Sequence, residues 1–388
     1  MERGEAMAHA YDAIVIGLGA MGSATAYHLA RSGYRTLGLD AFGRGHTNGS
    51  SHGRTRGIRE AYAESPDYVP LVQRAYTLWR ELEAESDRHL LTITGGISIG
   101  RSNAPGTRGY AVQQESAARY GLAIETLTGD EVMVRYPGFR LPEGYFGIYD
   151  PHTGFLLPVD CVTAHLDLAL RHGATLHHDQ AVRQWSADGE GVKVETAHDT
   201  YTASRLVITA GPWAGQILRD LGLPLTPWHV YNVYFEPTQP ALFAADRFPV
   251  WGLDVPEGGY YGVPYRPEDG FKIGRHDWGE PCTPETAANV VTDAEIAAYR
   301  AIIETYLPAA AGPVRATATC IYTMTPDGHF IIDRHPAYSQ VAYGCGFSGH
   351  GFKFSAAVGE ALSEIVTKGQ STIPIGFLSA ARFAPMPV

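Results

Sequence analysis

The stretch from Tyr11 to Asp40 constrains the fold more than any other part of this 388-residue chain. Residues 11–17 form a continuous apolar run, which is typical of a fully buried strand. The run leads into the turn Gly17-Leu-Gly-Ala-Met-Gly22, then a helical stretch and a second predicted strand over 36–40 that ends on an acid. A strand, a glycine turn, a helix, a strand and an acid together form the fingerprint of a dinucleotide-binding unit.

Residues of this unit have distinct expected roles toward a dinucleotide. Gly17 permits the tight turn, Gly19 lets a pyrophosphate approach the backbone, and Gly22 lets the helix pack closely on the strand. Met21 begins the helix, whose N-terminal N–H groups attract phosphates. Asp40 can accept a hydrogen bond from a ribose 2′-hydroxyl, which favours FAD or NAD over NADP. The fingerprint alone does not separate FAD from NAD, and a tight turn without a ligand is the alternative.

Composition excludes several other classes. The chain carries 30 Lys+Arg against 41 Asp+Glu, a net charge of −11, which argues against a nucleic-acid or anionic-membrane partner. No apolar run reaches the roughly 18 residues of a membrane span. Residues 1–10 lack the apolar region of a signal peptide and residues 386–388 carry no targeting address, so we expect a cytoplasmic protein. The four cysteines lie far apart without a CxxC pair, so no metal site is expected.

A basic, glycine-rich segment over 46–59 follows the predicted nucleotide unit and has no hydrophobic period, which indicates a long loop. Residues 44–60 contain four arginines and one acid, namely Arg44, Arg54, Arg56, Arg59 and Glu60. A solvated basic loop is the ordinary interpretation of such a run. Its position favours a functional one, because a loop here can reach the reactive end of a cofactor.

The rest of the chain divides into two parts with different sequence patterns. Helices are predicted at 66–89, 158–172, 293–307 and from about 352, and strands at 174–178, 181–187, 191–196, 205–210, 228–235, 259–265, 270–275, 315–324, 329–333 and 340–344. The strand at 205–210 leads to Gly211, where it can close on a cofactor. Between about 216 and 314, aromatic strands are interrupted by Pro and Gly, which favours an antiparallel sheet forming a cavity wall over a βαβ repeat.

Eight segments spread along the chain identify a family resemblance. They are Gly17–Gly22, His46–Arg59, the strand into Gly211, Tyr260–Pro264, Lys272–His276, Cys320–Tyr322, His329–Asp333 and Gly346–Phe354. On these segments the chain resembles the monomeric sarcosine oxidase and N-methyltryptophan oxidase family, within the D-amino-acid-oxidase-like flavoproteins. The resemblance implies a monomer with covalently attached FAD. It also implies O₂-dependent removal of an N-methyl group from sarcosine or a related N-methyl amino acid, giving the primary amino acid, formaldehyde and hydrogen peroxide.

The resemblance further implies an α/β, two-domain flavoprotein. We expect a Rossmann-like FAD-binding domain made of residues 10–85, 145–215 and 315–388. The remaining segments, 86–144 and 216–314, are expected to form a substrate-binding domain on an antiparallel sheet.

Two sets of roles follow for single residues. By resemblance, Cys320 attaches FAD through an 8α-S-cysteinyl bond, and a nearby positive group should help to ionise its thiol. The ordinary alternative is a small buried hydrophobe on a strand. By resemblance, Arg59 and Lys353 bind the substrate carboxylate, while Lys353 also faces the cofactor from a helix N-terminus. Ser50, Gly211, Gly349 and Gly351 complete the expected cofactor contacts.

The resemblance assigns catalysis to a second set. Lys272 is placed near flavin N5, where a cation favours the reduction of O₂. His276 lies four residues further, on the same face of a strand, and is a candidate for contacting the substrate amine, with Tyr261 and Tyr322 beside it. The amine must lose its proton before oxidation, which suits a neutral imidazole. Arg56 is placed on the flavin face as electrostatic support, with a structural arginine binding backbone carbonyls as the alternative.

Four positions depart from the family pattern. Arg54 replaces an expected acidic residue, and Gly57 replaces an expected bulky aliphatic residue. Cys345 replaces a small apolar residue, and Trp278 replaces a smaller aromatic residue. We expect all four near the pocket or the flavin, so larger substrates (N-methyltryptophan, pipecolate or fructosyl amino acids) are the alternative. Another alternative function is that of a flavin-binding subunit in a larger complex. An NAD dehydrogenase would require neither Cys320 nor the basic loop.

Overall fold

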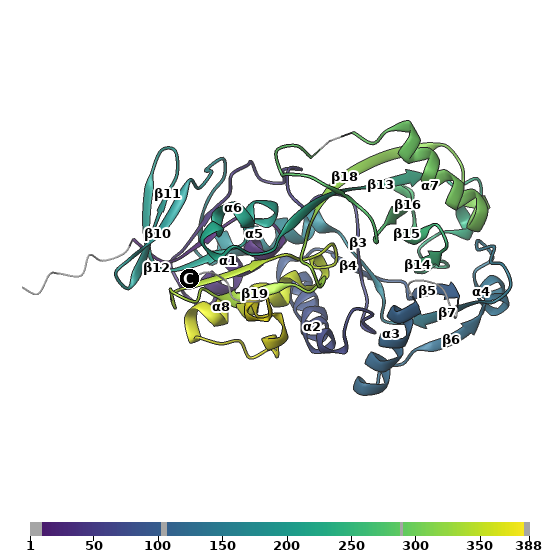
Figure 1. Ribbon diagram of the computed structural model, residues 1–388, viewed down its shortest axis with the longest axis horizontal. Coiled ribbons are helices and arrows are strands. Elements are labelled where there is room, and N and C mark those ends of the chain that lie inside the picture. The colour runs from purple at the N-terminus through teal and green to yellow at the C-terminus, as the bar shows by residue number, and fades with distance from the viewer. Residues whose placement is uncertain (1–9, 102–106, 288–289, 384–388) are drawn as a thin grey trace, which may run out of the picture.

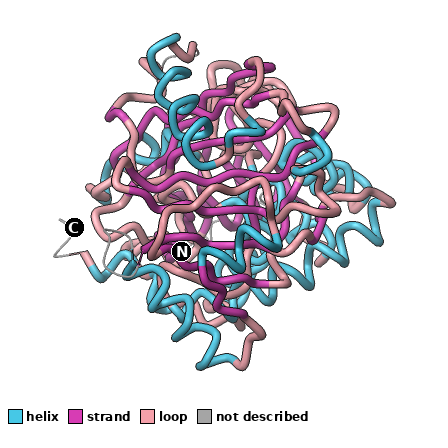
Figure 2. The backbone as a smooth tube through the Cα atoms, turned by 90° about the vertical axis from the view of Figure 1, so that its right-hand side faces the viewer, coloured by secondary structure: helices cyan, strands magenta, loops and turns pink. Residues whose placement is uncertain are grey.

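The computed structural model describes residues 10–101, 107–287 and 290–383. The expectations for residues 1–9 and 386–388 lie outside these ranges. Figure 1 shows an elongated molecule in which one sheet and its helices lie at the left and a second sheet lies at the right. In the view of Figure 2, strands cross the middle of the molecule and helices follow its outside.

The first sheet contains the predicted nucleotide unit. Strand β1 (Tyr11–Ile16) lies between β2 (Thr36–Leu39) and β12 (Thr200–Ile208), parallel to both. Two further strands pair in parallel: β9 (Thr175–His177) with β2, and β20 (Val341–Cys345) with β12. Three strands pair antiparallel: β11 (Gly191–Glu195) with β12, β10 (Gln184–Asp188) with β11, and β19 (Ile331–Arg334) with β20. The inner parts of the central strands, Ala13–Ile16 of β1 and Leu206–Ile208 of β12, are apolar and buried because helices cover them.

Four helices accompany this sheet. They are α1 (Ala20–Arg31), α2 (Val69–Ser86), α5 (Pro158–Arg171) and α8 (Ser355–Lys368). Helix α1 packs against α5 and α8, so every residue from Ala20 to Ala30 is buried. The apolar face predicted for 66–89 is confirmed, because Leu71, Ala75, Leu78 and Leu82 of α2 are all buried.

The second sheet is mostly antiparallel, as the interrupted aromatic strands of residues 216–314 predict. Its strands in spatial order are β17 (Glu280–Pro281), β13 (Thr226–Phe235), β16 (Gly270–Arg275), β15 (Gly258–Arg266), β14 (Val250–Val255), β5 (Gly96–Arg101), β7 (Tyr145–Asp150) and β6 (Glu125–Thr128), with β18 (Val314–Met324) on the other side of β13. Four more α-helices belong to the rest of the described chain: α3 (Thr107–Tyr120), α4 (Gly129–Arg135), α6 (Ala214–Ile217) and α7 (Asp293–Tyr306). Helix α6 follows β12 after a short turn that begins at Gly211.

A third, small sheet lies between the two others in Figure 1 and contains part of the basic loop. Strand β8 (Gly154–Leu156) pairs with both β3 (Arg56–Ile58) and β4 (Leu91–Ile93). The expectation of an unbroken loop over 46–59 is therefore wrong at its end, because pairing to a distant strand, rather than local periodicity, makes β3 extended.

The expected domain boundaries and the sheets differ at two places. Strands β7 and β18 pair within the second sheet, whereas the expected boundaries at 145 and 315 assigned them to the FAD-binding part. The division into domains otherwise stays a prediction.

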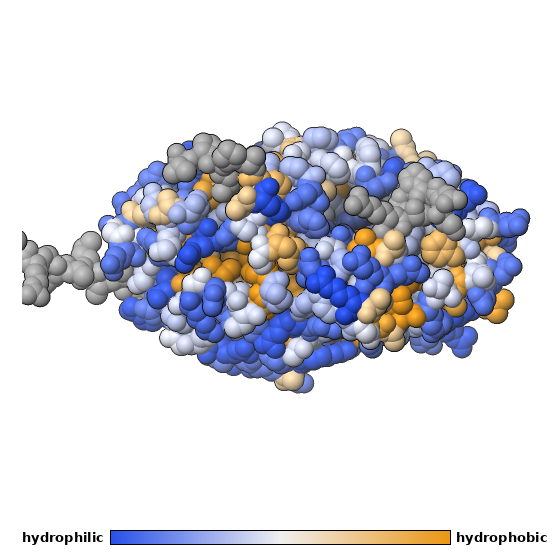
Figure 3. Space-filling model, turned by 60° about the horizontal axis from the view of Figure 1, so that its bottom comes forward, coloured by the Kyte–Doolittle hydropathy of each residue, from blue (hydrophilic) through white to orange (hydrophobic). Residues whose placement is uncertain are grey.

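The surface seen in Figure 3 is mostly hydrophilic, and its apolar areas are small and separated by polar side chains. Within the described ranges, no helix is long and apolar enough to cross a membrane.

Candidate functional site

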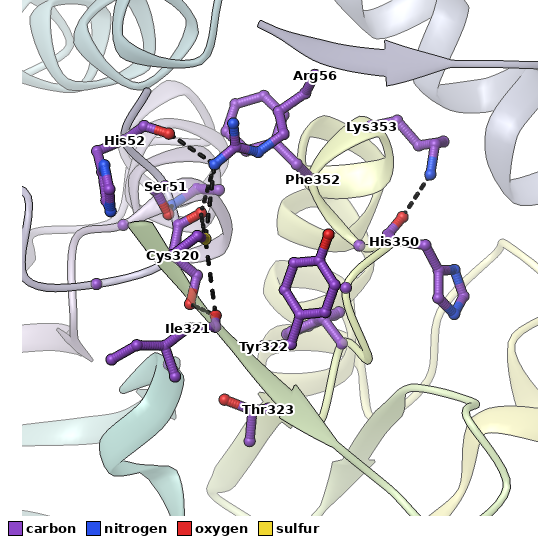
Figure 4. A pocket seen from close by; sticks show the side chains of 18 of the residues that line it. Ser51, His52, Arg56, Cys320, Ile321, Tyr322, Thr323, His350, Phe352 and Lys353 are labelled. Atoms are coloured by element: carbon purple, nitrogen blue, oxygen red, sulfur yellow. Dashed lines mark hydrogen bonds between the residues drawn. The ribbon is translucent and has the colours of Figure 1, made fainter. Parts of the chain in front are cut away.

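A cavity of about 870 Å³ brings together residues that are distant in the sequence. Its lining includes the Gly17–Met21 turn, much of the loop over 39–59, strands of the second sheet and the segment over 344–353. Expected cofactor residues Gly19, Met21, Ser50, Gly211, Gly349 and Gly351 all line it, as do the expected catalytic residues. Figure 4 shows one part of this cavity from close by.

The glycine turn has the geometry that its sequence predicts. Gly17 has a φ of +86°, in the left-handed region that favours glycine. A Cβ on Gly22 would lie 1.7 Å from the Gly17 carbonyl oxygen and 2.6 Å from Thr209 Oγ1. The helix can therefore approach the strand this closely only with glycine at position 22.

Two N–H groups of the turn already have protein acceptors. Leu18 N donates to Asp40 Oδ2 at 2.7 Å, and Ala20 N donates to Ser51 Oγ at 2.9 Å. Asp40 Oδ1 also accepts from Phe42 N at 3.0 Å. Each carboxylate oxygen has a second lone pair, so Asp40 can still accept from a ribose hydroxyl. These bonds position the acid and the turn relative to each other.

Cys320 on β18 and Arg56 on β3 meet in the cavity, as Figure 4 shows. Arg56 Nη2 is 3.8 Å from Cys320 Sγ, so Arg56 provides the positive group that the sequence led us to expect near the thiol. The guanidinium also donates to three backbone carbonyls, those of Thr55 at 3.0 Å, Ser50 at 3.2 Å and His52 at 2.6 Å. These carbonyl contacts are the ones expected if Arg56 has a structural role, which is the alternative interpretation.

Lys272 comes from the second sheet and reaches the basic loop. It lies on β16, is 2 % exposed, and its Nζ donates to the Thr55 carbonyl at 3.2 Å. Burial, and then the charge of Arg56, lower the pKa of Lys272 to about 7. Lys272 is therefore a buried lysine rather than a solvated surface one.

Arg59 is held by an acid that the sequence did not single out. Its Nη2 donates to both carboxylate oxygens of Glu64, at 2.6 and 2.7 Å. Burial opposes the charge of Arg59, but the Glu64 carboxylate outweighs it and raises the pKa of the guanidinium. Arg59 Nε is buried without a hydrogen-bond partner among the described residues. An unpaired buried donor is unusual, and Arg59 itself lines the cavity.

Lys353 lies in the short 3₁₀ turn Phe352–Phe354 that precedes α8 and is 8 % exposed. Its Nζ donates to the His350 carbonyl at 2.6 Å, a bond drawn in Figure 4, and lies 3.4 Å from Tyr62 Oη. Burial, and then the charge of Arg59, lower the pKa of Lys353 to about 7. Lys353 is therefore a buried lysine rather than a surface one.

His276 follows the end of β16 and lines the cavity between two tyrosines. Its ring centroid is 5.9 Å from that of Tyr322 and 6.3 Å from that of Tyr261. The two tyrosine hydroxyls are 3.2 Å apart, and Tyr261 Oη donates to Asn232 Oδ1 at 3.0 Å. Desolvation lowers the pKa of His276, although the nearby Glu64 carboxylate offsets part of the shift. A neutral imidazole is therefore favoured near pH 7.

The four departures from the family pattern lie in different surroundings. Gly57 lines the cavity. Arg54 turns away and donates to Asp269 Oδ1 at 2.9 Å, Cys345 is fully buried in β20, and Trp278 is 38 % exposed beside Tyr231. None of these three is among the cavity-lining residues, although Gly344 and Gly346 beside Cys345 and Asp277 beside Trp278 are, so their nearness to the flavin stays a prediction.

The sequence pattern of the FAD dependent oxidoreductase family matches residues 12–365. The chain belongs to the FAD dependent oxidoreductase family. It is 40 % identical over 386 residues to the monomeric sarcosine oxidase of Streptomyces avermitilis, covering 98 % of this chain and 100 % of that protein. It is 33 % identical over 387 residues to the N-methyl-L-tryptophan oxidase of Yersinia pestis, covering 96 % and 99 %.

Among solved structures of similar fold is NikD, an unusual amino acid oxidase essential for nikkomycin biosynthesis. Its TM-score is 0.85 at 24 % identity, with 95 % of this chain and 97 % of that chain covered. The expected α/β flavoprotein fold is thus confirmed, and FAD is the cofactor of this family member.

Sequence reasoning missed the partners of the expected residues. Glu64 binds Arg59, Tyr62 and His350 bind one another at 2.6 Å beside Lys353, and Asn232 binds Tyr261. His350 lies inside a segment that carries the resemblance, so its position was visible while its role was not. Glu64 and Asn232 have no periodicity or motif that would reveal them.

Proposed function

We propose that this family member is an FAD-dependent oxidase of N-methyl amino acids, of which sarcosine is the simplest. The reaction converts R–NH–CH₃, O₂ and H₂O into R–NH₂, formaldehyde and H₂O₂. The observation that carries the proposal is one cavity that contains Arg59 with a buried, unpartnered Nε, Lys353 at 8 % exposure, and a histidine suited to be neutral. Such a set suits a small substrate with a carboxylate and an amine.

FAD fits the rest of this cavity. Gly17 and Gly22 permit the tight turn and the close packing of α1, and Asp40, which accepts from Leu18 N and Phe42 N, would accept from a ribose hydroxyl. When bound, FAD accepts the hydride equivalent from the N-methyl group and delivers the electrons to O₂. We propose that Cys320 holds it covalently, which its contact with Arg56 supports.

Arg59 and Lys353 would bind the substrate carboxylate. Each can give a charge-assisted hydrogen bond worth about 1.5–3 kcal/mol, which is a large share of the affinity of a molecule as small as sarcosine. Glu64 fixes the guanidinium of Arg59 through Nη2 and leaves Nε for the ligand. With the carboxylate anchored, the amine would lie toward His276.

His276 would accept the proton of the substrate ammonium, since an ammonium has no lone pair and cannot be oxidised. Its lowered pKa keeps the ring neutral and able to accept. Tyr261 and Tyr322 flank the ring; Asn232 accepts a hydrogen bond from Tyr261, whose hydroxyl lies 3.2 Å from that of Tyr322. Lys272, beside the Thr55 carbonyl, would supply the positive charge that favours O₂ reduction.

The test is an assay of purified protein with sarcosine that follows peroxide and formaldehyde together. We expect equal amounts of both without any added partner protein, and a mass in solution of one chain. Arg59→Ala should raise KM by about 10- to 100-fold, because a charge-assisted bond is lost. Arg35→Ala is the control and should leave KM unchanged, because this exposed arginine pairs with Asp12 and is not part of the cavity lining. Peroxide without formaldehyde, or an unchanged KM in Arg59→Ala, would contradict the proposal.

Oxidation of a bulkier secondary amino acid is the second candidate. It is favoured by one observation, the absence of a side chain at Gly57 in the cavity wall.

A further inference from the structure

One wall of the cavity lacks a side chain at Gly252. Ser98 on β5, Gly252 on β14 and Tyr261 on β15 are paired across neighbouring strands, so they share one face of the sheet. All three line the cavity. A Cβ on Gly252 would meet no heavy atom of the described residues within 4 Å. Beside Tyr261, the wall is therefore open.

A second missing side chain widens the same region. Gly57 on β3 also lines the cavity, and a Cβ there would have Val250 Cγ1 as its nearest neighbour, at 3.8 Å. Val250 and Gly252 lie on the same face of β14, since side chains alternate along a strand and this strand alternates between half-buried and buried positions. Gly57 and Gly252 thus border one continuous space.

Two hydrogen-bond acceptors lie where this space ends. Asp254 is the next residue of β14 on the cavity face, and its Oδ2 lies 2.7 Å from Tyr110 Oη. Gln113 lies one turn along α3 from Tyr110, lines the cavity, and is 2 % exposed. Its Oε1 has no hydrogen-bond partner in the part of the chain that the structure describes. A buried carbonyl oxygen left unpaired is costly unless a ligand satisfies it.

The charge of this end is negative. Asp277 also lines the cavity. Burial has the largest effect on the pKa of Asp254 and raises it; the hydrogen bond from Tyr110 and the charge of Arg59 lower this pKa, and the Asp277 carboxylate raises it. Arg59 is already paired with Glu64, and Asp277 with Arg275 at 2.7 Å. Gly252 and Asp254 are two residues apart, roughly 7 Å along a strand. A flexible four-carbon stem carrying an ammonium can bridge that distance.

We propose that Gly57 and Gly252 border a side-chain subsite, ended by Gln113 and Asp254, which selects N-methyl amino acids whose extended side chain ends in a cationic hydrogen-bond donor. This inference rests on the proposed oxidase function and names its substrate class. Sarcosine, which has no side chain, would leave the subsite unused. An anionic side chain would face Asp254 and be rejected.

The test compares four substrates on the holoenzyme: sarcosine, N-methyl-L-norleucine, Nα-methyl-L-lysine and N-methyl-L-glutamate. We expect kcat/KM for the lysine derivative to exceed that for the norleucine derivative at least about tenfold, since the two differ by one charged donor. The glutamate derivative should be the poorest of the three extended substrates. Equal values for these three, or sarcosine as the best substrate, would overturn the subsite. Failure of all four to give peroxide would instead overturn the proposed function.

Two variants locate the effect. Asp254→Asn should reduce the preference for the lysine over the norleucine derivative about tenfold, whereas Asp246→Asn, whose side chain is 77 % exposed, should not. Gly252→Leu should lower kcat/KM for both extended substrates at least about tenfold more than for sarcosine. Gly376→Leu is its control, because Gly376 is exposed and also has open space at its Cβ position among the described residues.

A binding measurement separates selection from folding. Anaerobic bleaching of the flavin at increasing substrate concentration gives an apparent Kd, which should rise in Asp254→Asn for the lysine derivative and not for norleucine. The same rise for both substrates would show a structural defect and overturn the role of Asp254.

Discussion

Cys320 illustrates how a single residue acquires its chemistry from a neighbour. Its Sγ lies 3.8 Å from the Arg56 guanidinium, and it also contacts the Ser50 carbonyl. A thiol beside a fixed cation forms the thiolate more readily than one in an apolar core. Cys161 is such a core thiol, fully buried in α5, and burial raises its pKa.

We predict that acid-precipitated protein stays yellow after washing, because FAD is attached through Cys320. In Cys320→Ser the flavin should appear in the supernatant, while in Cys282→Ser, a partly exposed thiol outside the cavity lining, it should remain in the pellet. Absorbance of the two fractions measures this. Complete release of flavin from the unmodified protein would refute the linkage.

Lys353 predicts a pH dependence of carboxylate binding. Its lowered pKa of about 7 makes it cationic below pH 7 and neutral above. Arg59 holds the pKa of Glu64 well below its usual range, although burial opposes this, and desolvation lowers the pKa values of His276 and His350. Lys272 in the same cavity also has a pKa lowered to about 7, so the variants below separate the two lysines. The Kd of a simple carboxylate such as acetate should be nearly constant between about pH 5 and 6, where acetate is itself ionised, and rise above pH 7 by up to about tenfold per unit.

The control for this profile changes only the titrating group. Lys353→Arg should keep the affinity high and remove the pH dependence, because an arginine stays protonated. Lys353→Met should give weak binding at every pH. Flavin absorbance during acetate titration measures both, and an unchanged slope in Lys353→Met would assign the titration to another residue.

At the scale of elements, the strand–turn–helix unit shows how little freedom the glycine turn has. The helix α1 is buried between α5 and α8, so it cannot move outward to make room for a side chain at the turn. The Gly17 carbonyl and Thr209 Oγ1 already occupy the space where a Cβ of residue 22 would lie.

We therefore expect Gly22→Ala to destabilise the fold by roughly 3 kcal/mol or more, as overpacking of a fixed backbone does, and to lower the FAD content. Gly215→Ala on α6 is the matched control, since Gly215 is exposed and has open space at its Cβ position within the described part of the chain. Thermal unfolding and the flavin-to-protein absorbance ratio measure both effects. Equal stability of the two variants would contradict the close packing.

At the scale of the whole molecule, the site is assembled where the two large sheets approach each other. Lys272 and His276 come from the second sheet, whereas Arg56 belongs to the small sheet and Lys353 precedes the last helix of the first. The net charge of −11 describes the whole chain, yet the cavity gathers Arg56, Arg59, Lys272 and Lys353. The same lining also holds Arg44 and the acids Asp40, Glu64, Asp254, Asp277 and Glu285, so its formal charges balance, whereas the chain as a whole is acidic.

This assembly predicts that Lys272 acts on one half of the reaction. In Lys272→Met, reoxidation of the reduced enzyme by O₂ should slow by about 100-fold or more, because a preorganised charge is lost, while flavin reduction by substrate should slow much less. Lys193→Met, at an exposed lysine of β11, is the control. Stopped-flow absorbance separates the two steps, and equal losses in both would remove Lys272 from this role.

The sequence by itself determined the βαβ unit, most strands and helices, and the identities of the residues that gather in the cavity. It did so because local patterns carry that information: a continuous apolar run, glycines at a fixed spacing, and motifs in a fixed order. Elements with weak periodicity, such as β3 and β4, were missed because pairing to distant β8 makes them strands.

Only the tertiary structure decided which side chains meet. It paired Arg59 with Glu64, left Nε without a partner among the described residues, directed Arg54 toward Asp269, and put Gly57 and Gly252 in the lining of one cavity. These outcomes depend on the packing of strands that lie far apart in the chain. Direction, burial and neighbouring charge arise from that packing, and they convert a list of residues into a site with a selectivity.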